Sequence, residues 1–187
     1  MNISNRANRP IFPNLEDIEA IIFDFDGVFT DNKVYVDSLG NETVRCDRGD
    51  GLGLDILRSY IEKKNLRLET FILSKEKNSV VSRRAEKLKI GCFQGIDSKA
   101  SFLCNYAAEK KINPKKILYL GNDLNDLGAI KFAGFVVSPS DSHPLVINEA
   151  DVILSSKGGE GFVREFVEEI LNIRKMLPDE VINLLEQ

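Results

Sequence analysis

The 187-residue sequence has few cysteines and a single histidine, which limits the metal and redox chemistry available to it. Cys46, Cys92 and Cys104 are odd in number and form no C-x-x-C pair, so neither a disulfide framework nor a zinc site is indicated. The histidine, His143, directly precedes a proline and is better explained as a loop residue than as a metal ligand. A reducing, cytoplasmic setting is therefore expected.

The sequence also lacks an excess of basic residues and any long apolar run. Lys and Arg total 25 against 29 Asp and Glu, which gives a formal net charge of -4. Binding to nucleic-acid phosphates needs clustered Lys and Arg, so no nucleic-acid partner is expected. No stretch approaches 18 consecutive apolar residues, and the first twenty residues lack the basic start and apolar core of an export signal. We expect neither a membrane span nor export.

What the sequence does contain is an alternation of short apolar runs with amphipathic segments. Strands are predicted at 19–25, 70–74, 91–95, 116–121, 134–138 and 151–155, with a hairpin at 33–46. Helices are predicted at 53–64, 76–89, 99–111, about 124–132 and about 161–175. This order is typical of an α/β domain whose mainly parallel sheet carries helices on both faces. We expect one domain over residues 16–187, preceded by a loose extension over 1–15.

Polar residues follow four of the predicted strands at their carboxyl ends, where such sheets bind ligands. In chain order they are Asp24 and Asp26, then Ser74, then Lys99, and finally Asn122, Asp123 and Asp126. Carboxylates with further oxygen donors suit Mg2+, which commonly leaves coordination positions for water and a substrate phosphate. A hydroxyl and an ammonium would serve the remaining phosphate oxygens. The set predicts a magnesium-dependent phosphoryl-transfer site.

The order of these motifs resembles the haloacid dehalogenase superfamily of phosphatases. The stretches DFDGVFTDNKVYVDSLGN, RGDGLGL, SRRAEKLKI, GNDLNDL and GGEGFVREF are similar to its small capless branch. That branch contains 3-deoxy-octulosonate 8-phosphate and nonulosonate (sialic-acid-type) 9-phosphate phosphatases, and the same domain ends animal CMP-sialate synthetases. The resemblance covers about residues 19–170. It implies a three-layer, Rossmann-like fold with a protruding β-hairpin and no cap domain.

The resemblance also implies roles for individual residues. Asp24 would attack phosphorus and form an aspartyl-phosphate, while Asp26 would exchange protons with the leaving group and with water. Asp26 argues against dehalogenation, which uses the first aspartate without the second. Ser74 and Lys99 would hold the phosphoryl oxygens. Thr30 is expected to bind substrate. Thr30 and Gly27 are also expected to shape the turn after the nucleophile.

The expected Mg2+ ligands are Asp24, Asp26, Asn122 and Asp123. At Asn122 the sequence departs from the branch's usual GDDxxD pattern, because GND replaces a metal-binding aspartate with an amide and removes one negative charge. Loss of catalysis, leaving an assembly domain like that of CMP-sialate synthetases, is therefore an open alternative. Other open alternatives are that Ser74 caps the helix at 76–89, that Lys99 is a solvated charge, and that Asp123 and Asp126 cap the helix from 124.

Substrate and assembly are expected from the same resemblance. Glu76, Arg84 and Lys87 stand where nonulosonate 9-phosphate phosphatases contact the sugar, the last two reaching over from a neighbouring subunit. Arg84 and Lys87 are three residues apart and would share a helix face. A nine-carbon keto-sugar acid 9-phosphate is thus preferred over the octulosonate 8-phosphate, which remains the alternative. A homotetramer joined by the 33–46 hairpins would bury Val34, Tyr35 and Val36.

Overall fold

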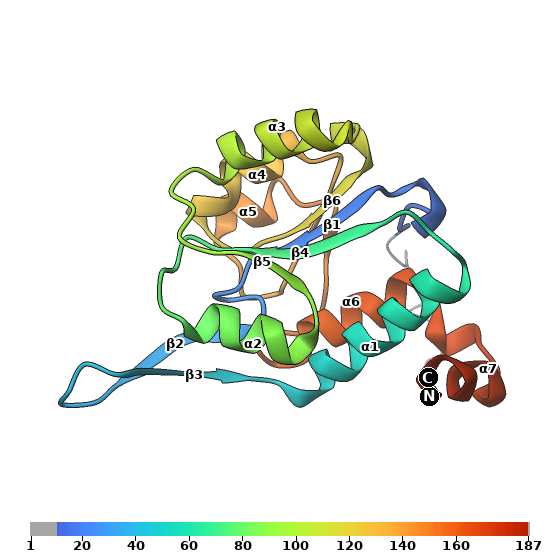
Figure 1. Cartoon of the computed structure of the whole chain (residues 1–187), viewed down its shortest axis with the longest axis horizontal. Coiled ribbons are helices and arrows are strands. Elements are labelled where there is room, and N and C mark those ends of the chain that lie inside the picture. The colour runs from blue at the N-terminus through green and yellow to red at the C-terminus, as the bar shows by residue number, and fades with distance from the viewer. Residues whose placement is uncertain (1–10, 187) are drawn as a thin grey trace, which may run out of the picture.

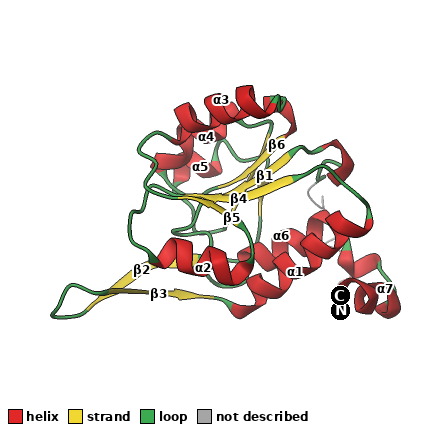
Figure 2. Cartoon of the chain, viewed as in Figure 1, coloured by secondary structure: helices red, strands yellow, loops and turns green. Residues whose placement is uncertain are grey.

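The central layer of the protein is a six-stranded, entirely parallel sheet (Figures 1 and 2). The computed structural model describes residues 11–186. In spatial order the strands are β5 (Gly91–Phe93), β4 (Glu69–Leu73), β1 (Ala20–Phe23), β6 (Ile117–Leu120), β7 (Phe135–Ser138) and β8 (Val152–Ile153). The α/β fold class expected from the alternating sequence pattern is confirmed.

Strand β1 lies in the middle of the sheet and explains why the chain folds around it. Its side chains alternate between the two faces, as a pleated strand requires. Ile21 and Phe23 enter the hydrophobic core on one face, and Ala20 and Ile22 enter the core on the other. All four are fully buried, so the carboxyl end of β1 is held rigidly between its neighbours β4 and β6.

Helices cover both faces of the sheet. On one side lie α1 (Arg48–Lys63), α2 (Val80–Leu88) and α6 (Phe162–Ile170); on the other lie α3 (Lys99–Lys110), α4 (Leu127–Phe132) and α5 (Pro144–Ile147) (Figure 1). The last helix, α7 (Pro178–Leu185), contacts α1. Short 3-10 turns at Leu15–Asp17, Pro114–Lys116, Leu124–Asp126 and Ile173–Lys175 complete the elements. The result is the three-layer arrangement that the resemblance implied.

An antiparallel hairpin projects from this body. It consists of β2 (Thr30–Val36) and β3 (Glu42–Cys46), and the Asp37 carboxylate closes its tip by accepting from the backbone N–H groups of Leu39 and Asn41. Figure 1 shows it extending away from both helical layers. Val34, Tyr35 and Val36 are 50%, 64% and 62% exposed within the single chain. The hairpin expected at 33–46 is present and begins three residues earlier.

Three helix boundaries differ from those expected by four residues or more. Helix α1 begins at Arg48 rather than 53, because the Asp47 side chain caps it by accepting from the N–H of Gly49. The helix continues through Gly53, where a Cβ would lie 3.1 Å from Arg164 Cα, so the close packing of α1 against α6 favours glycine there. Helix α2 begins at Val80 rather than 76, after a turn. The segment expected as one helix over 161–175 ends its α-helix at Ile170; Asn172 adopts a left-handed conformation, and α7 follows unpredicted.

Residues 11–15 pack against the domain, although they were expected to belong to a loose extension over 1–15. The Phe12 ring lies 5.8 Å from that of Phe135 and 6.0 Å from that of Phe166, and Leu15 is buried in the core. The packing of the partly buried Phe12 and the burial of Leu15 hold residues 11–15 against the domain. Residues 1–10, which make up the rest of the expected extension, lie outside the described residues. Every helix within residues 11–186 is too short or too polar to span a bilayer.

Candidate active site

Side chains from different strands meet at one edge of the sheet, as expected for parallel strands. A cavity of about 470 Å³ opens there. Its lining comprises Asp24, Asp26, Ser74, Lys75, Glu76, Lys77, Asp97 and Asn125. The structure therefore brings both predicted aspartates and the predicted serine together. Lys99 lies directly behind them.

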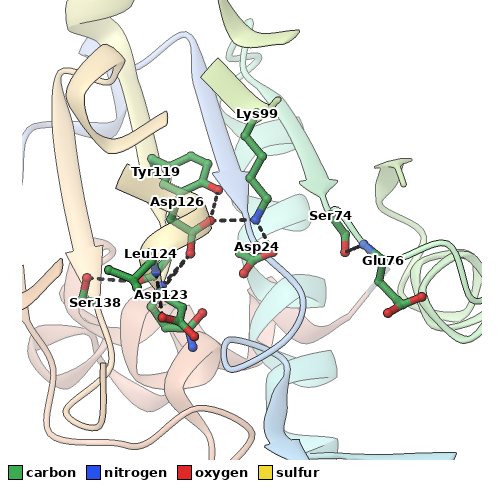
Figure 3. A network of polar contacts seen from close by, with 11 residues as sticks. Asp24, Ser74, Glu76, Lys99, Tyr119, Asp123, Leu124, Asp126 and Ser138 are labelled. Atoms are coloured by element: carbon green, nitrogen blue, oxygen red, sulfur yellow. Dashed lines mark hydrogen bonds and ion pairs between the residues drawn. The ribbon is translucent and has the colours of Figure 1, made fainter. Parts of the chain in front are cut away.

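Lys99 is the first residue of α3 and joins two buried carboxylates (Figure 3). Its Nζ lies 2.6 Å from Asp24 Oδ1 and 2.7 Å from Asp126 Oδ1. The three side chains are at most 4% exposed, so Lys99 is no solvated surface charge. An ammonium has three N–H donors, and these two carboxylates use two of them. The remaining donor is available for a phosphoryl oxygen.

Burial and like charge set the protonation of these groups. Burial first, and the nearby Asp126 second, raise the pKa of Asp24 to about 8, while Lys99 opposes the shift. Burial works to lower the pKa of Lys99, but Asp24 and Asp126 outweigh it and the net pKa is raised. Burial also raises the pKa of Asp26, with Glu76 adding to the effect. Lys99 thus stays charged, and additional positive charge would favour the ionised form of Asp24.

The turn after β1 directs Asp24 and Asp26 to the same cavity. Thr30 is fully buried, and its hydroxyl accepts from the backbone N–H of Gly27 and of Asn32, both at 3.2 Å. The expectation that Thr30 binds substrate is therefore corrected, because its hydroxyl is enclosed by the turn that it shapes. Gly27 has φ +79°, and a Cβ there would lie 1.9 Å from Asn122 Nδ2. Only glycine allows this approach.

Asp126, which the sequence placed among the polar residues at the strand ends with helix capping as the alternative, is a central residue of the site. Its Oδ2 accepts from the backbone N–H of Asn122 at 2.9 Å and of Asp123 at 3.2 Å, while Oδ1 accepts from Lys99 and from the Tyr119 hydroxyl. Asp123 and Asp126 also form a capping box, so the capping alternative is confirmed as a second role. The sequence did indicate Asp126, because an acidic residue three positions after Asp123 is typical of a capping box. It did not indicate Tyr119, because an apolar or aromatic residue in a buried strand is usually a core residue.

The residues present fit a hard divalent cation. Asn122 is buried, and its Oδ1 has no hydrogen-bond partner among the described residues, which is costly unless a ligand completes it. Nearby, three carboxylates (Asp24, Asp26 and Asp126) face one ammonium. Within residues 11–186 no cluster of three His, Cys, Asp or Glu side chains suits a metal. A cation would therefore depend on Asp24 and the amide oxygen of Asn122, and the family resemblance implies the backbone carbonyl of Asp26 as a further ligand.

The side chain of Asp123, the fourth expected metal ligand, accepts a hydrogen bond from the backbone. Its Oδ1 accepts from the N–H of Leu124 at 2.7 Å, as the N-cap of the turn at Leu124–Asp126. Its carboxylate therefore serves the local structure. Asn122, one residue earlier, carries the unpartnered oxygen and is the better candidate ligand of the two.

The turn after β4 carries Ser74 and Glu76. The Ser74 hydroxyl accepts from the backbone N–H of Glu76 at 3.0 Å, so it begins a turn and does not cap α2. Its own proton is free to be donated to a phosphoryl oxygen. The Glu76 carboxylate lines the cavity but accepts from the N–H groups of Lys77 and Asn78, at 2.6 Å and 2.7 Å. Glu76 is thus held in place by the turn that it stabilises.

Arg84 and Lys87 lie apart from these residues within one chain. Arg84 Nη2 donates to the backbone carbonyl of Asp47 at 2.9 Å, at the start of α1, whereas Lys87 is exposed. Among the described residues, neither belongs to the lining of the cavity. The expected substrate contacts are therefore not made within the chain. They would require a neighbouring subunit, as the resemblance implied.

Comparison with known proteins places this geometry in a family. The model for haloacid dehalogenase-like hydrolases matches residues 54–166, more than half of the chain. The chain belongs to the haloacid dehalogenase-like hydrolase family. It is 30% identical over 167 residues to 3-deoxy-D-manno-octulosonate 8-phosphate phosphatase KdsC of Salmonella typhimurium, covering 87% of this chain and 86% of that protein. The expected enzyme class, a phosphoric monoester hydrolase, is confirmed by the family and its phosphatase members.

Solved structures agree with the sequence relatives. A HAD family hydrolase structure from Streptomyces avermitilis is 42% identical with a TM-score of 0.79, over 87% of this chain and 96% of that one. The 3-deoxy-D-manno-octulosonate 8-phosphate phosphatase of Moraxella catarrhalis, in complex with magnesium, phosphate and KDO, is 31% identical with a TM-score of 0.76, over 84% and 88% of the two chains. The N-acylneuraminate cytidylyltransferase A of Danio rerio is 28% identical over 86% of this chain, which spans 36% of that relative.

Proposed function

We propose that this protein is a divalent-metal-dependent phosphatase of acidic keto-sugar phosphates, with Asp24 as its nucleophile. The observation that carries the proposal is the contact of Lys99 Nζ with Asp24 Oδ1 at 2.6 Å, at the floor of a cavity that Asp26 and Ser74 also line. A nucleophile, a proton donor and two phosphoryl-binding groups thus share one site. This combination supports phosphoryl transfer through an aspartyl-phosphate.

Each side chain has a role in a proposed reaction of two steps. In the first, a carboxylate oxygen of Asp24 bonds to phosphorus, the bond from phosphorus to the sugar oxygen breaks, and Asp26 gives that oxygen a proton. In the second, Asp26 takes a proton from water, whose oxygen displaces Asp24 and releases inorganic phosphate. A raised pKa keeps a carboxyl protonated closer to neutral pH, which suits Asp26 as the acid of the first step.

Lys99 and Ser74 would stabilise the phosphoryl group during both steps. The free N–H of Lys99 and the hydroxyl proton of Ser74 are donors held in place before the reaction, so little reorganisation is needed as charge develops. A bound Mg2+ would neutralise phosphate charge and favour the ionised form of Asp24. Its candidate donors in this chain are Asp24, Asn122 and the carbonyl of Asp26.

Two sugar acids are candidate substrates. The names of the relatives support the eight-carbon 3-deoxy-octulosonate 8-phosphate, and this reverses the order expected from the sequence. One observation favours the nine-carbon nonulosonate 9-phosphate: Glu76, expected to contact that sugar, does line the cavity. The two substrates share the carboxylate and phosphate and differ in length.

Phosphate release from a small aryl phosphate tests the reaction before the sugar is known. We expect release that requires Mg2+, stops with a chelator and is lost on Asp24→Asn, which keeps the shape of the side chain. Asp97→Asn is the matched control, because it neutralises an exposed carboxylate at the rim of the same cavity. Substantial turnover by folded Asp24→Asn would contradict the mechanism. A wild-type protein without any turnover would favour the assembly-domain alternative.

Competition between the two sugar acids tests the substrate. With both phosphates supplied at equal concentration, the ratio of products gives the ratio of kcat/KM values directly. An excess of the octulosonate product would support the eight-carbon substrate named for the relatives. An excess of the nonulosonate product would support the nine-carbon substrate and the contact expected from Glu76. Assembly into a homotetramer through the hairpins, in a reducing cytoplasm, remains part of this proposal.

A further inference from the structure

The buried ion cluster contacts a tyrosine that no step of the proposed reaction uses. Tyr119 lies on β6, is fully buried, and its hydroxyl donates to Asp126 Oδ1 at 2.7 Å (Figure 3). The same oxygen accepts from Lys99 Nζ at 2.7 Å. Tyr119 thus contacts Asp126, which in turn accepts a hydrogen bond from Lys99. It is the one non-ionic side chain bonded to this cluster among the described residues.

Asp126 is oriented by four donors, two on each oxygen. Backbone N–H groups of Asn122 and Asp123 hold Oδ2, and Lys99 and Tyr119 hold Oδ1. Without the phenol, Oδ1 would keep only the ammonium as a donor, and the carboxylate could turn toward Lys99. Lys99 is shared between Asp126 and Asp24, so any shift toward one carboxylate changes its contact with the other.

The surrounding chain is built to permit this contact. A Cβ at Gly121 would lie 2.7 Å from Tyr119 Cε1 and 2.8 Å from Asp126 Cγ, so the ring and the carboxylate can meet only beside a glycine. The phenol is also suited to be a donor. Burial, followed by the charges of Asp126 and Asp24, raises its pKa well above the ordinary value. Tyr119 therefore remains protonated.

We infer that Tyr119 is a positioning residue for phosphoryl transfer, which fixes Asp126 so that Lys99 contacts Asp24 and keeps one N–H free for the phosphoryl group. The inference rests on the proposed function and adds a residue to it. A core tyrosine with only a structural role would also seek an acceptor. It would not, however, change phosphate affinity or turnover once the protein is folded.

Tyr119→Phe tests the inference, because it removes only the hydroxyl. Tyr106→Phe is the matched control, because Tyr106 lies on α3 with its ring against Phe71 and Phe102 and does not line the cavity. For Tyr119→Phe we expect kcat/KM for a small aryl phosphate to fall about tenfold, the order typical of a hydrogen bond to a charged group. The dissociation constant of inorganic phosphate, measured by calorimetry with Mg2+, should rise severalfold. Tyr106→Phe should leave both quantities within twofold.

Two outcomes would overturn the inference. One is a folded Tyr119→Phe protein whose kcat/KM and phosphate affinity stay within twofold of the wild type. The other is an equal loss in Tyr106→Phe. If the wild type bound phosphate but released none from any substrate, the proposed function would fail, and the two phosphate affinities would still decide the role of Tyr119.

A second measurement covers the case in which Tyr119→Phe does not fold. The chain has four tyrosines, so labelling with 3-fluorotyrosine and replacing Tyr35, Tyr60 and Tyr106 with Phe leaves a single 19F resonance, that of Tyr119. Because the phenol is linked to Lys99 through Asp126, this resonance should move when inorganic phosphate and Mg2+ are added. A resonance that stays unchanged at saturating phosphate would contradict the inference.

Discussion

Replacing Lys99 with Met should destabilise the fold more than any surface change, although Lys99 is the first residue of a helix. Methionine keeps the length and most of the apolar stem while removing the charge. Asp24 and Asp126 would then face each other, buried, where one ammonium now lies 2.6 Å and 2.7 Å from their oxygens. Removing one partner of a buried ion pair typically costs about 3–5 kcal/mol. We expect a loss of that size in the free energy of unfolding at pH 9.5.

The loss should depend on pH in a predictable direction. Without Lys99, which opposes the effects of burial and Asp126, the pKa of Asp24 would rise above its present value of about 8. A carboxyl with a higher pKa in the folded state binds more protons folded than unfolded between its two pKa values. Stability therefore falls as the pH rises across that interval. The wild-type carboxyl itself holds its proton up to about pH 8, so the two proteins diverge above that value, and Lys99→Met should be closer to the wild type at pH 8 than at pH 9.5.

Urea unfolding at both pH values, with a chelator present, measures the effect. Lys116→Met is the matched control, because Lys116 pairs with Glu19 at 3.1 Å on a half-exposed surface, where such a pair contributes about 0–1 kcal/mol. Adding Mg2+ should restore part of the stability of Lys99→Met by supplying positive charge beside Asp24. A Lys99→Met protein within about 1 kcal/mol of the wild type at pH 9.5 would refute the picture of a charge-dependent cluster.

Three further predictions concern the metal, the core and the assembly. Asn122→Asp should lower the Mg2+ concentration needed for half-maximal turnover by about tenfold, because one more negative charge tightens divalent binding; an unchanged requirement would show that Asn122 is no ligand. Burial raises the pKa of Asp50 to about 7, so the free energy of unfolding should fall between pH 4 and 7, and Asp50→Asn should flatten that slope in urea titrations. If the proposed homotetramer forms, Tyr35→Asp should convert it to smaller species in sedimentation, since the change places a charge among the apolar side chains of the hairpin. A wild-type monomer would remove the basis for this prediction.

The sequence alone determined the order of the six strands of the sheet and most of the residues that meet at the site. Short β-branched runs favour strands of a buried sheet, and the carboxyl ends of parallel strands lie at the same edge. Asp24 and Ser74, each placed directly after such a run, were therefore bound to meet. Lys99, at the start of a helix after the third run, and Asn122 followed by the same reasoning. Local patterns sufficed because the backbone direction fixes these positions.

The tertiary structure alone decided which of these groups contact one another. Lys99 and Asp24 are 75 residues apart in the sequence, and no local propensity encodes the 2.6 Å between them. The same holds for Tyr119, which looked like a core residue, and for Thr30, whose hydroxyl is enclosed by its own turn. The start of α1 moved to Arg48 because packing against α6 outweighed the low helix propensity of glycine. Side-chain direction and partner depend on burial between distant segments, and only the folded chain brings those segments together.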